Sequence, residues 1–459
     1  MLGPLLHYSI TPSPRFMKTD ITLKTRREFL RSTVLGSALS WTVPTFLANT
    51  FSAMHAAAAG SATQIVTGKD STILVVLQMA GGNDGLNTVV PFANDHYRKA
   101  RPRLGLTETD ILKISDEIGL HKSLTGFQEL YDAGQLAIIQ GIGYPNPNRS
   151  HFRSTEIWQT ASDSERFENT GWLGRYFDNA CAGCDPTVAV TLGRQMPQAF
   201  AAKNPKGICF DSPQNYRFQK ADKPGPGETD TTEDSYRKLN AVDEAQMENS
   251  GGTIGALHGA ARHAGSPLDF IERTALDAQI SSEKVRAITS RVENQAAYPG
   301  SQLANSLKMV AKLIGGGLPT RVFYVSQGGY DTHTNQTGAH ERLLADLGGA
   351  VKAFVNDLKA QGNLERVLVM TFSEFGRRVA ENASGGTDHG AAAPMFVIGN
   401  KVKAGVLGNY PSLAPADLNQ GDLKYTVDFR SVYASVLEQW LKTKSQPILG
   451  RKFEPMAVV

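Results

Sequence analysis

The sequence predicts an α/β protein with a mostly parallel central sheet flanked by helices. Six short apolar runs, rich in Val and Ile, indicate strands buried on both faces, because their residues do not alternate between apolar and polar. Helical patterns separate these runs, and an alternation of strand and helix is typical of parallel sheets. The expected strands are 72–79, 136–140, 188–192, 321–326, 366–371 and 394–399.

The helical patterns are clearest at 124–134, 340–362 and 428–441. Residues 214–298 depart from the alternation, because they are polar, charged and interrupted by Gly and Pro, and then become helical without strands. We expect a predominantly helical insertion here, within an α/β domain that covers 70–459. The alternative is two more helices on the sheet, joined by a long surface loop.

Composition is that of an ordinary soluble globular protein. The chain has 459 residues, of which 41% are hydrophobic and 20% charged, so it can bury a large core. Its formal net charge of +3 is small for this length and evenly spread. We therefore expect neither a nucleic acid nor a membrane surface as a partner.

The first 60 residues have the features of an export signal. Arg26 and Arg27 precede a moderately apolar stretch at 34–47 and a tract of small residues at 56–60, a pattern that resembles a twin-arginine signal peptide. We expect export by the twin-arginine translocase to the periplasm or the extracellular space. A short anchoring helix is the alternative, but the apolar stretch is shorter than the roughly 20 residues that span a bilayer, so no stable span is expected in the mature protein.

Three cysteines, Cys181, Cys184 and Cys209, indicate a disulfide rather than a zinc site, because an exported protein is oxidised and a structural zinc site needs four ligands. The spacing does not decide which two of them pair.

Polar side chains with catalytic or metal-binding chemistry follow four of the apolar runs. They are Asp84 and Asn87 after the first, Ser150 and His151 after the second, Asp331 and His333 after the fourth, and Glu374, Asp388 and His389 after the fifth. Ligands bind at the carboxyl ends of strands in open α/β sheets, so we expect these side chains to converge. Carboxylates gathered in one place repel one another unless a cation screens them. Mixed oxygen and imidazole ligands suit one or two ions of zinc, manganese or iron.

Taken singly, each of these residues also has an ordinary structural role. The alternatives are a turn for Asp84, a helix N-cap for Ser150, ion pairs of Glu374 with Arg377 or Arg378, and a surface hydrogen bond between Asp331 and His333. Only the joint placement favours a metal site.

The order of five motifs, GGNDGLNT, SHFRSTEIWQTA, GGYDTHTNQ, SEFGR and TDHG, resembles the bacterial family catalogued as domain of unknown function 1501, from about residue 72 to the C-terminus. That family is in turn similar to the superfamily of alkaline phosphatase, sulfatases and cofactor-independent phosphoglycerate mutase. The resemblance implies an alkaline-phosphatase-like fold and metal-assisted transfer of a phosphoryl or sulfuryl group.

The resemblance also implies roles for individual residues. The metal ligands it implies are Asp84, Asp331, His333, Glu374, Asp388 and His389, with the nucleophile at Ser150 or His151 and substrate contacts from Asn87, Arg153 and Arg377. Phe375 stands where a second metal would have a histidine ligand, which is a departure from the two-metal pattern.

We therefore expect an exported metal-dependent hydrolase that acts on a small anionic ester or an envelope glycan carrying phosphate or sulfate. If Ser150 is only a helix cap, water attacks directly and no covalent intermediate forms. The alternatives are a non-catalytic binding protein of the cell envelope on the same scaffold, or a metalloenzyme of another class.

Overall fold

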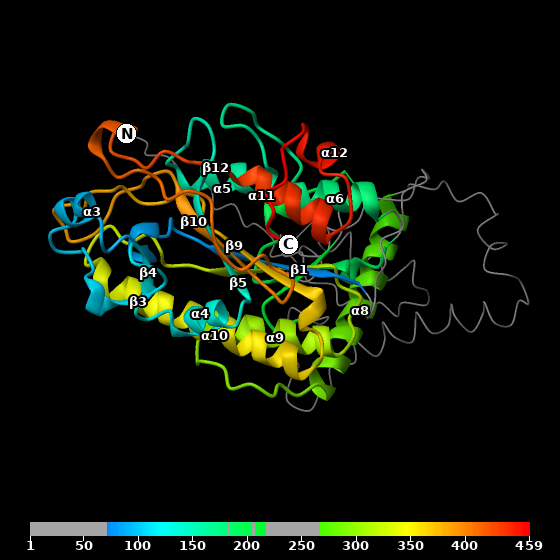
Figure 1. Ribbon diagram of the computed structural model, residues 1–459. Coiled ribbons are helices and arrows are strands. Elements are labelled where there is room, and N and C mark those ends of the chain that lie inside the picture. The colour runs from blue at the N-terminus through cyan, green and yellow to red at the C-terminus, as the bar shows by residue number, and fades with distance from the viewer. Residues whose placement is uncertain (1–70, 182–183, 204–206, 217–266) are drawn as a thin grey trace, which may run out of the picture. The chain divides into compact units, whose positions relative to one another are not determined.

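A nine-stranded sheet forms the centre of the fold, in the order β11-β5-β10-β9-β1-β8-β6-β7, with β12 paired to β5 (Figure 1). The computed structural model describes residues 71–181, 184–203, 207–216 and 267–459, all within one compact unit. The strands are β1 (Ile73–Met79), β5 (Leu136–Gly143), β6 (Ala189–Leu192), β7 (Ile208–Phe210), β8 (Val322–Gln327), β9 (Val367–Phe372), β10 (Ala393–Ile398), β11 (Gly405–Leu407) and β12 (Val427–Asp428). Each of the six expected strands is among them, and the α/β fold class is confirmed.

Among the described strands of this sheet, β10 alone runs antiparallel to its neighbours, β9 and β5. The start of β10 therefore lies at the same edge as the carboxyl ends of β1, β5, β8 and β9. Consequently the loops that follow β1, β5 and β8 and the loop that joins β9 to β10 meet at one edge of the sheet.

Helices cover both faces of the sheet (Figure 1). All seven residues of β1, ILVVLQM, are buried because its side chains point alternately into two apolar cores. One core includes residues of α4 (Thr125–Asp132), α8 (Pro267–Arg291), α9 (Gln302–Gly315) and α10 (Gln336–Ala360). The other includes residues of α5 (His151–Thr160), α6 (Trp172–Ala180), α11 (Phe429–Ser435), a π-helical turn (Val436–Trp440) and α12 (Gln446–Leu449).

A second, three-stranded sheet lies between β1 and α4 in the sequence. Its order is β2-β4-β3, and its strands are β2 (Val89–Val90), β3 (Ile111–Lys113) and β4 (Gly119–His121), with α3 (Asp95–Ala100) between β2 and β3. Short 3-10 helices lie at Gly85–Asn87, Glu108–Asp110, Pro186–Val188, Gln198–Phe200, Leu364–Arg366 and Pro415–Asp417. The sequence did not predict this small sheet, because its strands are only two or three residues long.

Parts of the predicted domain organisation lie outside the described residues. The expected signal segment, 1–60, is one of them, and so is most of the expected insertion at 214–298, where α8 is the main described element and packs against α9. Cys181 and Cys184 form a disulfide, and Cys209 is a buried free thiol. Within the part of the chain that the structure describes, no helix is long and apolar enough to cross a membrane.

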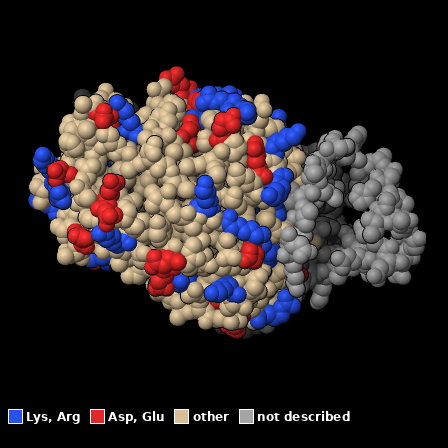
Figure 2. All heavy atoms as spheres, viewed as in Figure 1, with Lys and Arg blue, Asp and Glu red and all other residues tan. Residues whose placement is uncertain are grey.

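On the face shown in Figure 2, lysine and arginine side chains are interspersed with acidic ones, and large areas carry neither.

Candidate metal centre

The loops after β5 and β8 and the loop that joins β9 to β10 bring histidine and carboxylate side chains to one edge of the sheet. His151 is the first residue of α5 and follows β5, whereas Asp331 and His333 follow β8. Glu374 follows β9, and His389 precedes the reversed strand β10. The convergence predicted from strand ends therefore depends, for His389, on the direction of β10.

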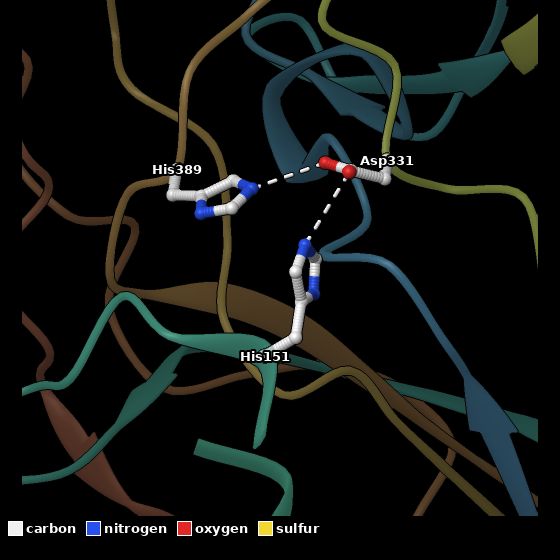
Figure 3. Close-up of side chains that lie close together, drawn as sticks. All are labelled: His151, Asp331 and His389. Atoms are coloured by element: carbon white, nitrogen blue, oxygen red, sulfur yellow. Dashed lines mark hydrogen bonds and ion pairs between the residues drawn. The ribbon is translucent and has the colours of Figure 1, made fainter. Parts of the chain in front are cut away.

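Three of these residues form a compact group (Figure 3). One ligand atom each from His151, Asp331 and His389 lies within 4.8 Å of the other two. Both rings point at the same carboxylate: His389 Nε2 lies 3.0 Å from Asp331 Oδ1, and His151 Nε2 lies 3.4 Å from Asp331 Oδ2.

His333 adds a third imidazole to this group. Its Nε2 atom lies 3.0 Å from Asp331 Oδ1 and 2.9 Å from His389 Nε2. The side chains of Asp331 and His333 are 46% and 40% exposed, so solvent can reach the group. His333 thus lies beside Asp331 and His389, at the solvent-accessible side of the group.

Each of the three imidazoles has a hydrogen-bond acceptor at Nδ1, on the side of the ring away from Asp331. The distances to Nδ1 are 2.9 Å from Glu374 Oε1 to His151, 3.2 Å from Asp388 Oδ1 to His333, and 2.8 Å from the Arg149 carbonyl oxygen to His389. A carbonyl oxygen and ionised carboxylates only accept hydrogen bonds, so these three acceptors favour the tautomer with the hydrogen on Nδ1. In the neutral rings the three Nε2 lone pairs then face Asp331. This is the arrangement of histidines that bind a metal.

Glu374 and Asp388 were both predicted as ligands, and the structure places them behind the imidazoles. Glu374 is buried, and its Oε1 atom accepts from the Gly81 amide at 2.8 Å as well as from His151. Its Oε2 atom is buried without a hydrogen-bond partner among the described residues. Asp388 also accepts from Asn382 Nδ2, at 3.2 Å.

Asp84 lies in a buried ion pair, outside the group of His151, Asp331 and His389. Both of its oxygens accept from Arg101, at 2.7 and 2.9 Å, and neither side chain is exposed. Burial alone would raise the pKa of Asp84, but the charge and hydrogen bonds of Arg101 outweigh it and hold the pKa below its usual range. The sequence predicted that Asp84 binds a metal, whereas in the structure its carboxylate binds Arg101.

Gln336 connects Asp84 to the loops of the site. Its Nε2 atom donates to Asp84 Oδ2 at 2.5 Å, and its Oε1 atom accepts from the Thr332 and Thr387 hydroxyls at 3.0 and 2.6 Å. Thr332 lies between Asp331 and His333, and Thr387 precedes Asp388. One amide thus fixes two ligand loops, a role that no sequence motif indicated.

Two of the predicted substrate contacts are occupied elsewhere. The Asn87 side chain accepts from Tyr97 and Arg101, both at 2.7 Å, and donates to the Leu104 carbonyl. The Arg153 guanidinium donates to backbone carbonyls, pairs with Glu156 and stacks over a phenylalanine ring. Both side chains thus have their donors bonded to backbone carbonyls or paired with acidic side chains of the protein, where a substrate contact was expected.

Arg377 does lie at the group. Its Nη2 atom donates to Asp331 Oδ1 at 2.7 Å. Its remaining donors bond the backbone carbonyls of Gly81, Gly82, Tyr330 and Thr387. Burial would raise the pKa of Asp331, but the hydrogen bond and the charge of Arg377 hold it well below its usual range. Arg377 therefore fixes the ionised carboxylate of the group.

Ser150 and Phe375 flank the group. Ser150 is exposed at the N-cap position of α5, but its side chain makes no capping hydrogen bond. The Phe375 ring is buried, with its centroid 4.9 Å from that of His151 and 4.5 Å from that of His389. An apolar ring therefore packs against two of the imidazoles, at the residue where the sequence departs from the two-metal pattern.

These observations define the class of protein: an α/β protein with a histidine and carboxylate group at the carboxyl edge of a mostly parallel sheet. A family model described as "Protein of unknown function (DUF1501)" matches residues 71–450, and the chain belongs to this family. The family predicted from the order of the motifs is confirmed. No curated protein matches the chain.

Solved structures that match the chain include a protein in the alkaline phosphatase superfamily from Vibrio parahaemolyticus, with 10% identity and a TM-score of 0.36 over 89% of this chain and 77% of that one. The PsFucS1 sulfatase from Pseudoalteromonas sp. has 10% identity and a TM-score of 0.33 over 85% and 74%. The C-terminal periplasmic domain of EcEptC from Escherichia coli, in complex with Zn, has 9% identity and a TM-score of 0.31 over 75% and 78%. With such scores, these similarities say nothing about the chemistry of the site.

Proposed function

We propose that this protein is a metal-dependent hydrolase of phosphate or sulfate esters. The observation that carries the proposal is the convergence of three imidazole Nε2 atoms on the Asp331 carboxylate, each ring oriented by an acceptor at Nδ1. Two of these Nε2 atoms lie 2.9 Å apart, a distance at which two lone pairs repel each other. A shared cation removes this conflict, so the residues fit a metal.

The donor set suits one ion of zinc, with manganese or iron as further candidates. His151, His389 and Asp331 would hold it, because a catalytic zinc ion has three protein ligands and keeps its fourth position open for water or substrate. Calcium prefers six to eight oxygen ligands, which this group does not offer. Phe375 fills the adjoining space, which supports one ion rather than two.

A divalent cation would supply Lewis-acid polarisation of an ester oxygen. The chain supplies the rest: Glu374, Asp388 and the Arg149 carbonyl keep the rings in one tautomer, and Arg377 keeps Asp331 ionised and in place. Preorganisation of this kind matters because the groups then need no reorientation when charge develops on the substrate.

Ser150 is the proposed nucleophile, because its hydroxyl is exposed at the start of α5, directly before His151. The positive end of the helix dipole favours an alkoxide or an anionic ester there. Its hydroxyl makes no hydrogen bond to the described residues of the group, so attack by water is the alternative. Replacing Ser150 by Ala distinguishes the two, because turnover by water attack would survive the loss of the hydroxyl.

The decisive experiment measures metal content and ester hydrolysis together. Protein stripped with a chelator and reloaded with zinc is expected to retain one ion per chain by mass spectrometry and to hydrolyse an aryl phosphate or an aryl sulfate. His389→Ala should lose both, whereas His96→Ala, an exposed histidine on α3, should lose neither. Protein that retains no ion at all would refute the proposal. Bound zinc without hydrolysis would favour the non-catalytic binding protein.

We also propose that the protein is exported by the twin-arginine route and meets its substrate, a small anionic ester or an envelope glycan, outside the cytoplasm. The support is the pair Arg26 and Arg27 ahead of an apolar stretch. Replacing both by Lys should leave the protein in the cytoplasmic fraction. Equal export of this variant and the parent would contradict the route.

A further inference from the structure

Several arginines lie in the loops around the candidate metal centre, and Arg378 differs from the others in its hydrogen bonds. Arg377 donates to four backbone carbonyls and Asp331, and Arg149 donates from Nε and Nη2 to Asp422. Arg101 donates to Asp84, Asn87 and two carbonyls. The Arg378 guanidinium, in contrast, makes no hydrogen bond to any residue that the structure describes.

Arg378 is next to the group in space. Its backbone amide donates to the Asp388 carbonyl at 3.0 Å, and the preceding residue, Arg377, forms an antiparallel bridge with His389. Asp388 in turn orients His333. The backbone of Arg378 therefore lies at the edge of the candidate site, and its guanidinium lies beside Asp422.

The ion pair of Arg378 is too long to occupy the guanidinium. Its Nε atom lies 3.7 Å from Asp422 Oδ1, beyond hydrogen-bond distance, and that oxygen is buried without a hydrogen-bond partner in the described chain. Arg149 already engages the other oxygen, Oδ2. The Arg378 side chain is 37% exposed, so its donors remain available to a ligand from solvent.

The charge of the group shows why such a ligand would need an arginine. The group carries three negative charges, on Asp331, Glu374 and Asp388, and one positive charge, on the buried Arg377. A divalent cation would therefore bring its net charge to zero and leave no positive charge in excess. A tetrahedral oxyanion that approaches this neutral group gains from a further positive charge. A guanidinium offers two parallel donors that match the oxygens of phosphate or sulfate.

We propose that Arg378 binds the anionic phosphate or sulfate group of the substrate. This inference rests on the proposed hydrolase function, which it deepens by naming the residue that recognises the acid group. It replaces Arg153 and Arg377, whose donors are occupied, as the expected substrate contact.

The experiment measures anion binding without turnover. Inorganic phosphate and inorganic sulfate are titrated separately into zinc-loaded protein by calorimetry, so that the two arms show which acid is preferred. Losing a hydrogen bond to a charged group costs about 1.5–3 kcal/mol, so Arg378→Met should weaken the preferred anion roughly 10- to 100-fold. Arg378→Lys should restore part of the affinity, because it keeps the charge without the planar fork.

Arg98→Met is the matched control, because Arg98 is an exposed arginine on α3 whose ion pair is with Asp95. It should bind the anion as the parent does, and circular dichroism should show all variants folded. An anion affinity that is the same in Arg378→Met and Arg98→Met would overturn this inference and leave the hydrolase proposal standing. Failure of the parent to bind zinc would instead refute the proposed function.

Discussion

Asp84 offers the sharpest test of the structure, because the sequence indicated a metal ligand and the structure shows a buried ion pair. Asp84→Asn removes the negative charge and leaves the fully buried Arg101 guanidinium without a counter-charge. Breaking a buried pair from one side costs about 3–5 kcal/mol, against a total stability of about 5–15 kcal/mol for a typical domain. We therefore expect a folded but strongly destabilised variant.

Urea denaturation of chelator-treated protein measures this loss, with fluorescence of the buried Trp158 and Trp172 as the signal. The control is Asp95→Asn, which breaks the pair between Asp95 and Arg98 on the surface of α3. Exposed pairs often contribute nothing measurable, so this variant should unfold at the same urea concentration as the parent.

The pH dependence gives the same prediction a second readout. The pKa of Asp84 is lower in the folded protein than its usual value of 3.8, so its contribution to stability is present above that value. The contribution is lost as the pH falls through the folded pKa. The stability gap between the parent and Asp84→Asn should therefore narrow below pH 3.8. Equal losses in Asp84→Asn and Asp95→Asn at neutral pH would refute the assignment of Asp84 to a buried pair.

Three further predictions concern other parts of the fold. A Cβ atom at Gly386 would lie 2.2 Å from the carbonyl carbon of His333, so Gly386→Ala should displace that loop and weaken zinc binding about tenfold or more by calorimetry; unchanged affinity would contradict the contact. Burial, with a smaller effect of Asp211, raises the pKa of Cys209 to about 12, so the native thiol should stay protonated and react with a thiol reagent at pH 8 only after unfolding, and fast labelling of folded protein would count against it. Zinc at 100 times its Kd should add about 2.7 kcal/mol to the unfolding free energy, and a chelator should remove this gain; a thermal midpoint indifferent to zinc would argue against a structured site.

The sequence predicted the position of the site in the fold better than it predicted the contacts between individual side chains. His151, Asp331 and His389 could be placed at one edge because each adjoins an apolar strand, and strand ends share an edge in a mostly parallel sheet. The reversal of β10 was not predicted, although it is what brings His389 to that edge.

Partners from distant parts of the fold could not be predicted. Asp84 follows its strand as a metal ligand would, and nothing in the motif indicates that Arg101, 17 residues further along, occupies both of its oxygens. Glu374 and Asp388 were recognised as acids of the site, but their position behind the imidazoles depends on ring orientation, which sequence spacing does not specify. Gln336 gave no signal because an isolated glutamine at the start of a helix is unremarkable.

The central position of β1 has a consequence for the order of events in folding. His151 and Glu374 touch although 223 residues separate them, and the strands that deliver Asp331 and Glu374 meet only through β1, which pairs with both β8 and β9. Contacts this distant in sequence form slowly, because a long loop must close before they contribute. A cation at this edge would therefore bind only after β8, β1 and β9 have paired. Bound cation would then indicate that the central sheet has formed.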